Sequence, residues 1–184
     1  MLRMKVAVIS DIHGNLHALE AVAEDLAQWQ PDEVVVAGDV VNRGPLSPEC
    51  WQFVQRMGWQ LLGGNHEEYV AAHQRPDVRV NEANRVSFWT YGQFEGEVEP
   101  LAELEDGRAL FAPNGAELRI RHASMRHNRD GIRLTTPLNT LRQQIGPAPA
   151  VFCTGHSHKP FICDLDETVI LNIGSVGQPC DGDV

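Results

Sequence analysis

Short apolar runs alternate with amphipathic segments over the first third of the chain. Three runs of β-branched and other apolar residues predict buried strands: residues 4–9, 33–37 and 59–62. Two segments between them have apolar residues at helical spacing: residues 16–29 and 47–57. Asn15 is a suitable N-cap for the first helix, and Pro48 suits the first turn of the second. This order predicts a largely parallel sheet with right-handed crossovers.

The rest of the chain predicts a second group of elements. Helices are expected at residues 67–74, 82–94 and 138–145. A hairpin with a tight Asn114-Gly115 turn is expected to join residues 108–112 to residues 117–122. Further strands are expected at residues 150–154, 161–164 and 168–173, with loops at 95–100 and 125–137. Without a repeat or a linker, the pattern predicts a single α/β domain over residues 1–184.

The composition is that of an ordinary globular domain, with 42% hydrophobic and 22% charged residues. The formal net charge of −10 argues against nonspecific binding of a nucleic-acid backbone, which requires a basic face. Nucleic acid is therefore not an expected partner. A phosphorylated substrate is compatible with an acidic chain if metal ions supply the positive charge.

No apolar run is long enough to predict a membrane helix, and the first residues lack the small-residue cleavage pattern of a secretory signal. Four cysteines are present without a C-x-x-C pair, which favours reduced thiols. We therefore expect a cytoplasmic protein with no membrane partner.

Residues with metal-binding side chains follow five of the predicted strands. They are Asp11, His13, Asp39, Asn65, His122, His156 and His158. Each alone has a simpler reading, as a turn residue, a helix cap or a buried histidine. Together they are expected to meet at one edge of the fold, because ligands bind at the carboxyl ends of strands in open α/β sheets.

Mixed oxygen and nitrogen donors without cysteine suit Mn, Fe, Zn or Ni, and the sequence does not choose among them. Seven donors are too many for one such ion but suit two divalent ions that share a carboxylate. Two ions about 3.5–4 Å apart are a known device for displacement at phosphorus.

These residues, taken in order, resemble the signature of a known family. The motifs are Asp11-x-His13, Gly38-Asp39, Gly64-Asn65-His66-Glu67, His122 and Gly155-His156-x-His158. The set resembles the calcineurin-like metallophosphoesterases, in particular their small bacterial, phosphodiesterase-like members. The resemblance implies a four-layer α/β/β/α sandwich with two packed mixed sheets.

The resemblance also implies a role for each motif residue. The first ion would be held by Asp11, His13, Asp39 and His158. The second would be held by Asp39, Asn65, His122 and His156, so that Asp39 bridges the two ions. The attacking group would be a metal-bridging hydroxide, with Asp39 and His66 as the catalytic residues. Glu67 would either orient His66 or cap the following helix.

Three residues are candidates for substrate binding: Arg43, Asn15 and His127. The segment around Arg43 resembles the phosphate-binding segment of the serine/threonine protein phosphatases, although an exposed loop arginine is the simpler alternative. Asn42 and Gly63 stand where those phosphatases usually have Asp and a second Arg, which counts against protein phosphatase activity. The basic loop containing His127 either lines the cleft or is solvated.

One aromatic cluster has two readings. Phe88, Trp89, Tyr91 and Phe94 are expected either to pack in the core or to cover a pocket that stacks a nucleobase.

The sequence therefore predicts a two-metal phosphoesterase that acts on a small phosphodiester or a nucleotide, such as a dinucleoside polyphosphate. A phosphomonoesterase or protein phosphatase, and a noncatalytic metal-binding regulatory domain, are the alternatives; a nuclease is a weaker one. Similar proteins often continue beyond a Gly-Gln-Pro segment. We therefore expect either a short form or a homo-oligomer that completes the second sheet with a partner.

Overall fold

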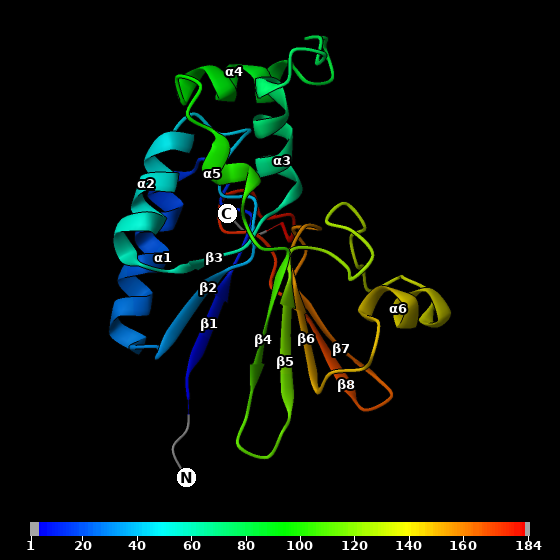
Figure 1. The fold of residues 1–184 in the computed structure, drawn as a ribbon. Helices are drawn as coiled ribbons and strands as arrows, with labels where there is room; N and C mark the ends of the chain where they lie inside the picture. Colours follow the sequence, from blue (N-terminus) through cyan, green and yellow to red (C-terminus); the bar gives the residue numbers. More distant parts are fainter. Residues whose placement is uncertain (1–3, 183–184) are drawn as a thin grey trace.

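A computed structural model describes residues 4–182 of the chain. Two β-sheets pack face to face, and helices cover their outer faces (Figure 1). The strands are β1 Val6–Ile9, β2 Glu33–Val36, β3 Gln60–Leu61, β4 Gly107–Phe111, β5 Glu117–Arg121, β6 Val151–Thr154, β7 Phe161–Leu165 and β8 Thr168–Asn172. The helices are α1 Leu16–Trp29, α2 Ser47–Met57, α3 Asn65–Ala71, α4 Arg85–Gln93, α5 Glu99–Ala102 and α6 Leu138–Ile145, with a 3-10 turn at Ala72–Gln74.

The smaller sheet has the order β1-β2-β3, and its strands are parallel, as the alternation of strands and helices predicts. Helices α1 and α2 lie on its outer face (Figure 1). Their apolar stripes bury Leu19 and Val54 against Ile9 and Val36 of the sheet. This packing holds the ends of β1 and β2 side by side, and the site is built from the loops that follow these ends.

The larger sheet has the order β4-β5-β6-β8-β7 and is mixed. Strands β5, β6 and β8 are parallel, while the hairpins β4-β5 and β7-β8 are antiparallel. Helix α6 packs Leu141 and Ile145 against Phe152 and Ile170 on the outer face of this sheet.

A separate apolar cluster joins the two sheets. It contains Val35 and Leu62 from the smaller sheet and its edge, and Ile120 and Cys153 from the larger sheet, all almost completely buried. The four-layer α/β/β/α sandwich is therefore confirmed, with one parallel and one mixed sheet.

Three local predictions differ from the structure. Helix α4 begins at Arg85 rather than at residue 82, because Asn84 Oδ1 accepts a hydrogen bond from the Asn81 N–H (2.8 Å) and closes a turn there. The segment predicted as a loop at residues 95–100 contains the start of α5, with Pro100 in its first turn. The β4-β5 loop is a three-residue turn, closed by Gly115 N–H to Ala112 O (2.8 Å) with a left-handed Gly115 (φ 83°).

The four aromatic residues predicted to form one cluster do not share one environment. Tyr91 and Phe94 pack against the core, whereas Phe88 and Trp89 are 45% and 50% exposed. Core packing is therefore the wrong interpretation for Phe88 and Trp89.

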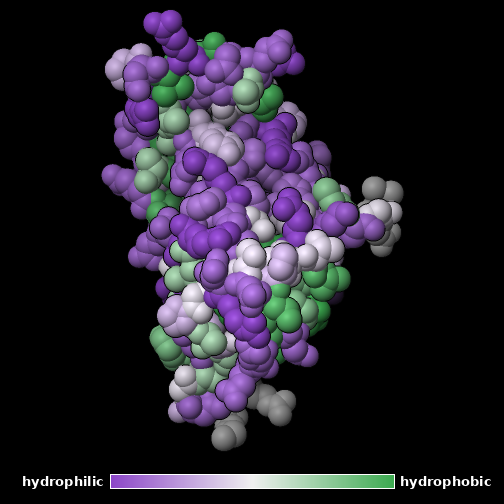
Figure 2. All heavy atoms as spheres, turned by 90° about the vertical axis from the view of Figure 1, so that its right-hand side faces the viewer, coloured by the Kyte–Doolittle hydropathy of each residue, from purple (hydrophilic) through white to green (hydrophobic). Residues whose placement is uncertain are grey.

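Figure 2 shows the face on the right-hand side of Figure 1 as mainly hydrophilic, with hydrophobic residues in separate groups. Within residues 4–182, no helix combines the length and the apolar character needed to cross a membrane.

Candidate active site

The strand-end loops are tied together by backbone hydrogen bonds. Asp11 N–H donates to Gly38 O (3.1 Å), His13 N–H to Asp39 O (2.9 Å), and Gly155 N–H to His122 O (2.9 Å). Seven of the ten non-glycine residues with positive φ in the described chain lie in these loops: Asp11, His13, Asp39, Asn42, Arg43, His156 and His158. Such backbone conformations are costly and concentrate at functional sites. Their clustering indicates that the functional site lies at this end of the sandwich.

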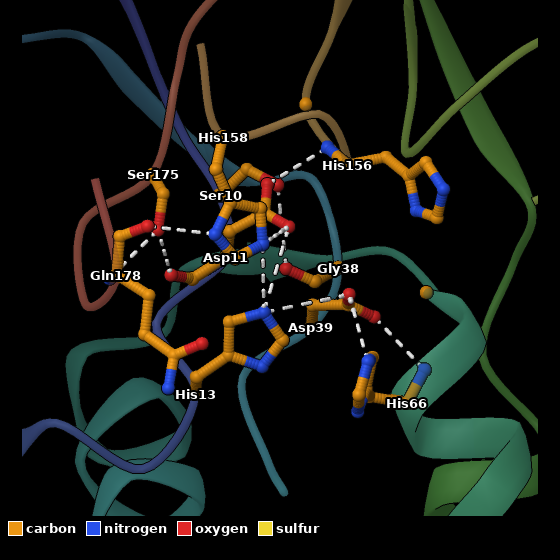
Figure 3. A network of polar contacts seen from close by, with 12 residues as sticks. Ser10, Asp11, His13, Gly38, Asp39, His66, His156, His158, Ser175 and Gln178 are labelled. Carbon is orange, nitrogen blue, oxygen red and sulfur yellow. Dashed lines mark hydrogen bonds and ion pairs between the residues drawn. The ribbon is translucent and has the colours of Figure 1, made fainter. Parts of the chain in front are cut away.

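The first group of side chains that could hold a metal ion comprises Asp11, His13 and His158 (Figure 3). His158 Nε2 lies 3.1 Å from Asp11 Oδ1 and 3.0 Å from His13 Nε2. All three side chains are buried. His158 Nδ1–H donates to Gln178 O (2.7 Å), so the lone pair of the neutral ring is on Nε2 and faces the other two side chains.

Asp11 Oδ1 and His13 Nδ1 are buried without a hydrogen-bond partner. A buried carboxylate oxygen without a donor is costly unless a cation balances it. The arrangement of lone pairs around Asp11 Oδ1 therefore fits a metal ion.

The second group comprises Asp39, His122 and His156, with Asn65 beside them. His122 Nε2 lies 3.3 Å from Asp39 Oδ2, 3.0 Å from Asn65 Oδ1 and 3.1 Å from His156 Nδ1. His122 Nδ1–H donates to Ala37 O (2.9 Å), which directs the Nε2 lone pair of the neutral ring to the shared centre. A backbone carbonyl that orients a histidine in this way is typical of metal sites.

Asp39 lies between the two groups. Its Oδ2 is 3.7 Å from His13 Nε2 and 3.3 Å from His122 Nε2. Its Oδ1 accepts the backbone N–H of His66 (2.9 Å), so Oδ2 faces both groups. This geometry suits a carboxylate that bridges two cations.

The charges in the site match those of metal ligands. Burial alone would raise the pKa of Asp39, but His122, His66 and His13 hold it well below its usual value. Burial likewise opposes a low pKa at Asp11, and His158 and His122 outweigh it. Burial lowers the pKa of His13 to about 3, so this imidazole is neutral.

His122 differs from His13. Burial would lower its pKa, but Asp39 outweighs burial and raises it to about 9. A cation bound to Asp39 would take the place of that proton, because metal binding displaces protons from histidine ligands.

Glu67 is fully buried and supports the Asp39 loop. Its carboxylate accepts four backbone N–H groups, those of Asp39 (2.9 Å), Val40 (2.8 Å), Val41 (3.2 Å) and Gly64 (2.9 Å). Burial and the nearby Asp39 raise its pKa to about 7, against the opposing effect of these donors. The contacts favour the capping alternative for Glu67, because the bond to Gly64 N–H is at the start of α3.

His66 is instead oriented by Asn42, whose Nδ2 lies 2.8 Å from His66 Nδ1. Asn42 Oδ1 accepts hydrogen bonds from Arg43 N–H (2.9 Å) and Thr90 Oγ1–H (3.3 Å), so its amide nitrogen must face His66. Burial lowers the pKa of His66 to about 4, against the opposing effect of Asp39. The neutral ring therefore accepts at Nδ1 and carries its proton on Nε2.

The three candidate substrate residues have different surroundings. Arg43 is exposed and lines the cleft, with its Nη1 donating to Gln178 Oε1 (3.2 Å). Both polar ends of the Asn15 side chain are used within the fold, Oδ1 by Ala18 N–H (3.2 Å) and Nδ2 by Gly177 O (3.1 Å). His127 is exposed, and it is absent from the cleft lining. The predicted N-cap at Asn15 is confirmed, and only Arg43 of the three lines the cleft.

A cleft of about 740 Å³ opens over this site. Its inner end is lined by Asp39, Asn42, Arg43, Asn65, His66, His156 and His158. A second part, which we call the cap arm, is lined by Tyr69, Ala72, His73, Val78, Asn81, Ala83, Asn84, Val86 and Ser87. None of the four aromatic residues considered as a cover for a nucleobase pocket lines it.

The loop after β8 supports the site in a way that the sequence alone does not reveal. Ser175 Oγ–H and Gly177 N–H both donate to Asp11 O (2.7 and 3.0 Å). Gln178 accepts a hydrogen bond from His158 through its carbonyl (Figure 3). Its side-chain oxygen accepts one from Arg43. A Cβ at Gly177 would lie 1.8 Å from Ile12 O, so only glycine permits this approach. The sequence pattern that could have indicated this supporting loop is the segment Asn172-Ile-Gly-Ser-Val-Gly-Gln.

Known proteins share this fold and part of its sequence. A metallophosphoesterase from Sphaerobacter thermophilus superposes with a TM-score of 0.76 and 26% identity, over 99% of this chain and 80% of that chain. An uncharacterized protein from Methanocaldococcus jannaschii is 28% identical over 99% of this chain and 80% of its own length. A symmetrical bis(5'-nucleosyl)-tetraphosphatase from Psychromonas ingrahamii is 37% identical, but over only 39% of this chain and 27% of that enzyme.

The family model described as calcineurin-like phosphoesterase matches residues 4–170. This match contains all of the strand-end motifs and seven of the eight strands in full. The chain therefore belongs to the calcineurin-like phosphoesterase family.

Proposed function

We propose that this chain hydrolyses a small phosphodiester or nucleotide with the help of two divalent metal ions. Its family supports phosphoester hydrolysis in general. The observation that carries the two-metal proposal is the position of Asp39, whose Oδ2 faces both His13 and His122 at 3.7 and 3.3 Å.

The residues would divide between two ions. Asp11, His13, Asp39 and His158 fit one ion, and Asp39, Asn65, His122 and His156 fit the other. These oxygen and nitrogen donors suit Mn, Fe, Zn or Ni. When bound, such ions supply positive charge to phosphoryl oxygens and lower the pKa of an attacking water.

His66 would donate a hydrogen bond from the Nε2–H of its neutral ring to the leaving oxygen and so stabilise the negative charge that develops there. Its Nε2 proton lies on the side of Asp39, with Nε2 4.0 Å from Asp39 Oδ2, at the inner end of the cleft. Asn42 donates to Nδ1 and so keeps the proton on Nε2. Arg43, on the same wall, would bind a phosphoryl oxygen through its guanidinium group.

This proton assignment predicts different effects for two variants at one position. Asn42→Ala removes the donor to Nδ1, and we expect turnover to fall by about 10- to 100-fold with the metal content unchanged. Asn42→Asp favours a proton on Nδ1 and raises the pKa of His66. Its Nε2 donor is then present in the doubly protonated ring and is lost as pH rises through that raised pKa.

Rates of both variants measured from pH 5 to 9, with the exposed Asn139→Ala as control, would test this assignment. The assignment is wrong if Asn42→Ala retains wild-type turnover, or if Asn42→Asp shows the wild-type pH profile.

The substrate class is supported by the size of the cleft and by the relatives. A volume of about 740 Å³ is in the range of sites for nucleotide-sized ligands. One relative with matching sequence over part of its length is a symmetrical bis(5'-nucleosyl)-tetraphosphatase. Both observations favour a small organic phosphoester, such as a dinucleoside polyphosphate, over a protein substrate.

Reconstitution of metal-stripped protein with Mn, Zn or Ni would test the proposal. We expect two ions per chain and faster hydrolysis of bis(p-nitrophenyl) phosphate than of p-nitrophenyl phosphate, followed by turnover of dinucleoside polyphosphates. Faster monoester hydrolysis would instead identify a phosphomonoesterase. Two bound ions with no turnover of any of these substrates would favour a noncatalytic metal-binding domain.

A further inference from the structure

We infer that the cap arm, between α3 and α4, binds the uncharged, ring-bearing part of the substrate, and that a nucleoside is the group it fits. This inference rests on the proposed function, since it assigns the part of the substrate that is not the reacting phosphate. The cap arm is continuous with the inner end of the cleft, where Asp39 and His66 lie.

The cap arm is formed by a compact part of the chain. Helix α3 carries Tyr69, the 3-10 turn carries His73, and the first turn of α4 carries Val86 and Ser87. A phosphoryl group needs only the inner end of the cleft. The cap arm therefore gives space for the rest of a nucleotide-sized molecule.

The walls of the cap arm carry no permanent charge. Among the residues that line the whole cleft, Arg43 is the one lysine or arginine, and it lies at the inner end. Burial lowers the pKa of His73, which keeps this imidazole neutral. The Arg129 guanidinium, which lies against Tyr69, is already paired with Glu68, so the walls favour a neutral ring with apolar faces and polar edges over a second phosphate.

Tyr69 places an aromatic ring next to the reacting end. The ring centroid of Tyr69 is 5.3 Å from that of His66. The Arg129 guanidinium lies 5.0 Å from the Tyr69 centroid. Arg129 is itself fixed by an ion pair with Glu68 (2.6 Å). Tyr69 is 38% exposed and lines the cleft, so a rigidly held ring surface is available for stacking.

The segment after the 3-10 turn and the start of α4 add small apolar and polar groups to the cap arm. Val78 and Val86 are apolar, and Ser87 Oγ accepts from His73 Nε2 (3.0 Å) while donating to Asn84 O (2.9 Å). This bond orders the joint between the 3-10 turn and α4. The cap arm is therefore preformed, and a base entering it does not have to order these side chains.

Two ligands that differ only in the base would test this inference. They are the phosphonate analogues of AMP and of ribose 5-phosphate, in which a methylene group replaces the 5'-oxygen so that neither is hydrolysed. We expect the metal-loaded wild-type protein to bind the AMP analogue more tightly in titration calorimetry. Tyr69→Ala should reduce this ratio of affinities by about five- to 150-fold, whereas Tyr69→Phe should retain it.

The control variant is Trp89→Ala, which removes an exposed aromatic ring of α4 that lies outside the cleft lining. It should keep the wild-type ratio. Amide NMR spectra of the wild-type protein give a second measurement that needs no variant. The AMP analogue should shift the signals of Ala72 and Ser87, and the ribose 5-phosphate analogue should not.

Equal affinity of the wild-type protein for the two analogues, or an unchanged ratio in Tyr69→Ala, would overturn the inference. Either result with normal phosphoester hydrolysis would leave the proposed function standing. A base preference that depends on Tyr69, in a protein with no hydrolysis, would support the cap arm as a binding site and reject the proposed function.

Discussion

Asp39→Asn is expected to cause the largest loss of metal binding and activity. The variant keeps the shape of the side chain, and its Oδ1 can still accept the His66 N–H that Asp39 Oδ1 accepts at 2.9 Å. It removes the negative charge that faces both His13 and His122. Because this one carboxylate would serve both ions of the proposed site, we expect metal content to fall from two ions to at most one per chain. Turnover should fall by at least about 10³-fold. This is more than the loss expected when a single electrostatic contact to the transition state is removed.

Elemental analysis after gel filtration, together with the initial rate on the best substrate, would check this expectation. Asp77→Asn is a matched control, because that carboxylate is exposed and paired only with Arg75. Two tightly bound ions in Asp39→Asn would show that the two groups of ligands are independent. Loss of fold would be separated from loss of metal by circular dichroism of both metal-free proteins.

The fold could be predicted well wherever burial and periodicity agree. The apolar run that forms β1 and the heptad-like spacing of Leu19, Val22 and Leu26 in α1 each follow one physical rule, and the residues 138–145 form a helix as predicted. The start of α4 could not be predicted, because it depends on a hydrogen bond from the Asn81 N–H to the Asn84 side chain. This bond closes a turn where the prediction placed the first turn of the helix. The exposure of Trp89 depends on which side of α4 meets the core.

The seven metal-binding side chains could be predicted to meet, since each follows a strand that ends at the same edge. The structure brings them together, and their roles as ligands stay a prediction for metal analysis. The supports of the site could not be predicted. Asn42 bonds to His66 across 24 positions, and Gln178 bonds to Arg43 across 135 positions. Such contacts follow no local pattern.

The substrate-binding roles expected for Asn15 and His127 also show how far residue type alone can predict function. Asn15 and His127 have side chains suited to phosphate binding, but the chain uses Asn15 to cap α1 and to bind Gly177 O. His127 Nδ1 accepts the Arg129 N–H (3.2 Å) in a tight turn. Residue type indicates what a side chain can do, whereas competing local bonds decide what it does.

His66→Gln is expected to separate chemistry from metal binding. Glutamine can still bond to Asn42, but it lacks the ring Nε2–H that would donate a hydrogen bond to the leaving oxygen. His66 lies close to His13 and Asp39, with ring centroids of His66 and His13 4.7 Å apart, but it is not one of the seven proposed ligands. We therefore expect two ions per chain and an unchanged fold. Turnover should fall by about 10²- to 10³-fold, the usual effect of removing one donor that stabilises charge in the transition state.

The size of this loss should also depend on the leaving group. A nitrophenolate spreads its negative charge over the ring, whereas an alkoxide concentrates the charge on one oxygen, so the loss of a donor to that oxygen should be greater for alkyl phosphodiesters. His17→Gln is the matched control, because the His17 side chain is 88% exposed on α1. An equal loss for both leaving groups would show that His66 does not act on the leaving oxygen. No loss at all, in a protein that retains two ions, would remove His66 from the reaction.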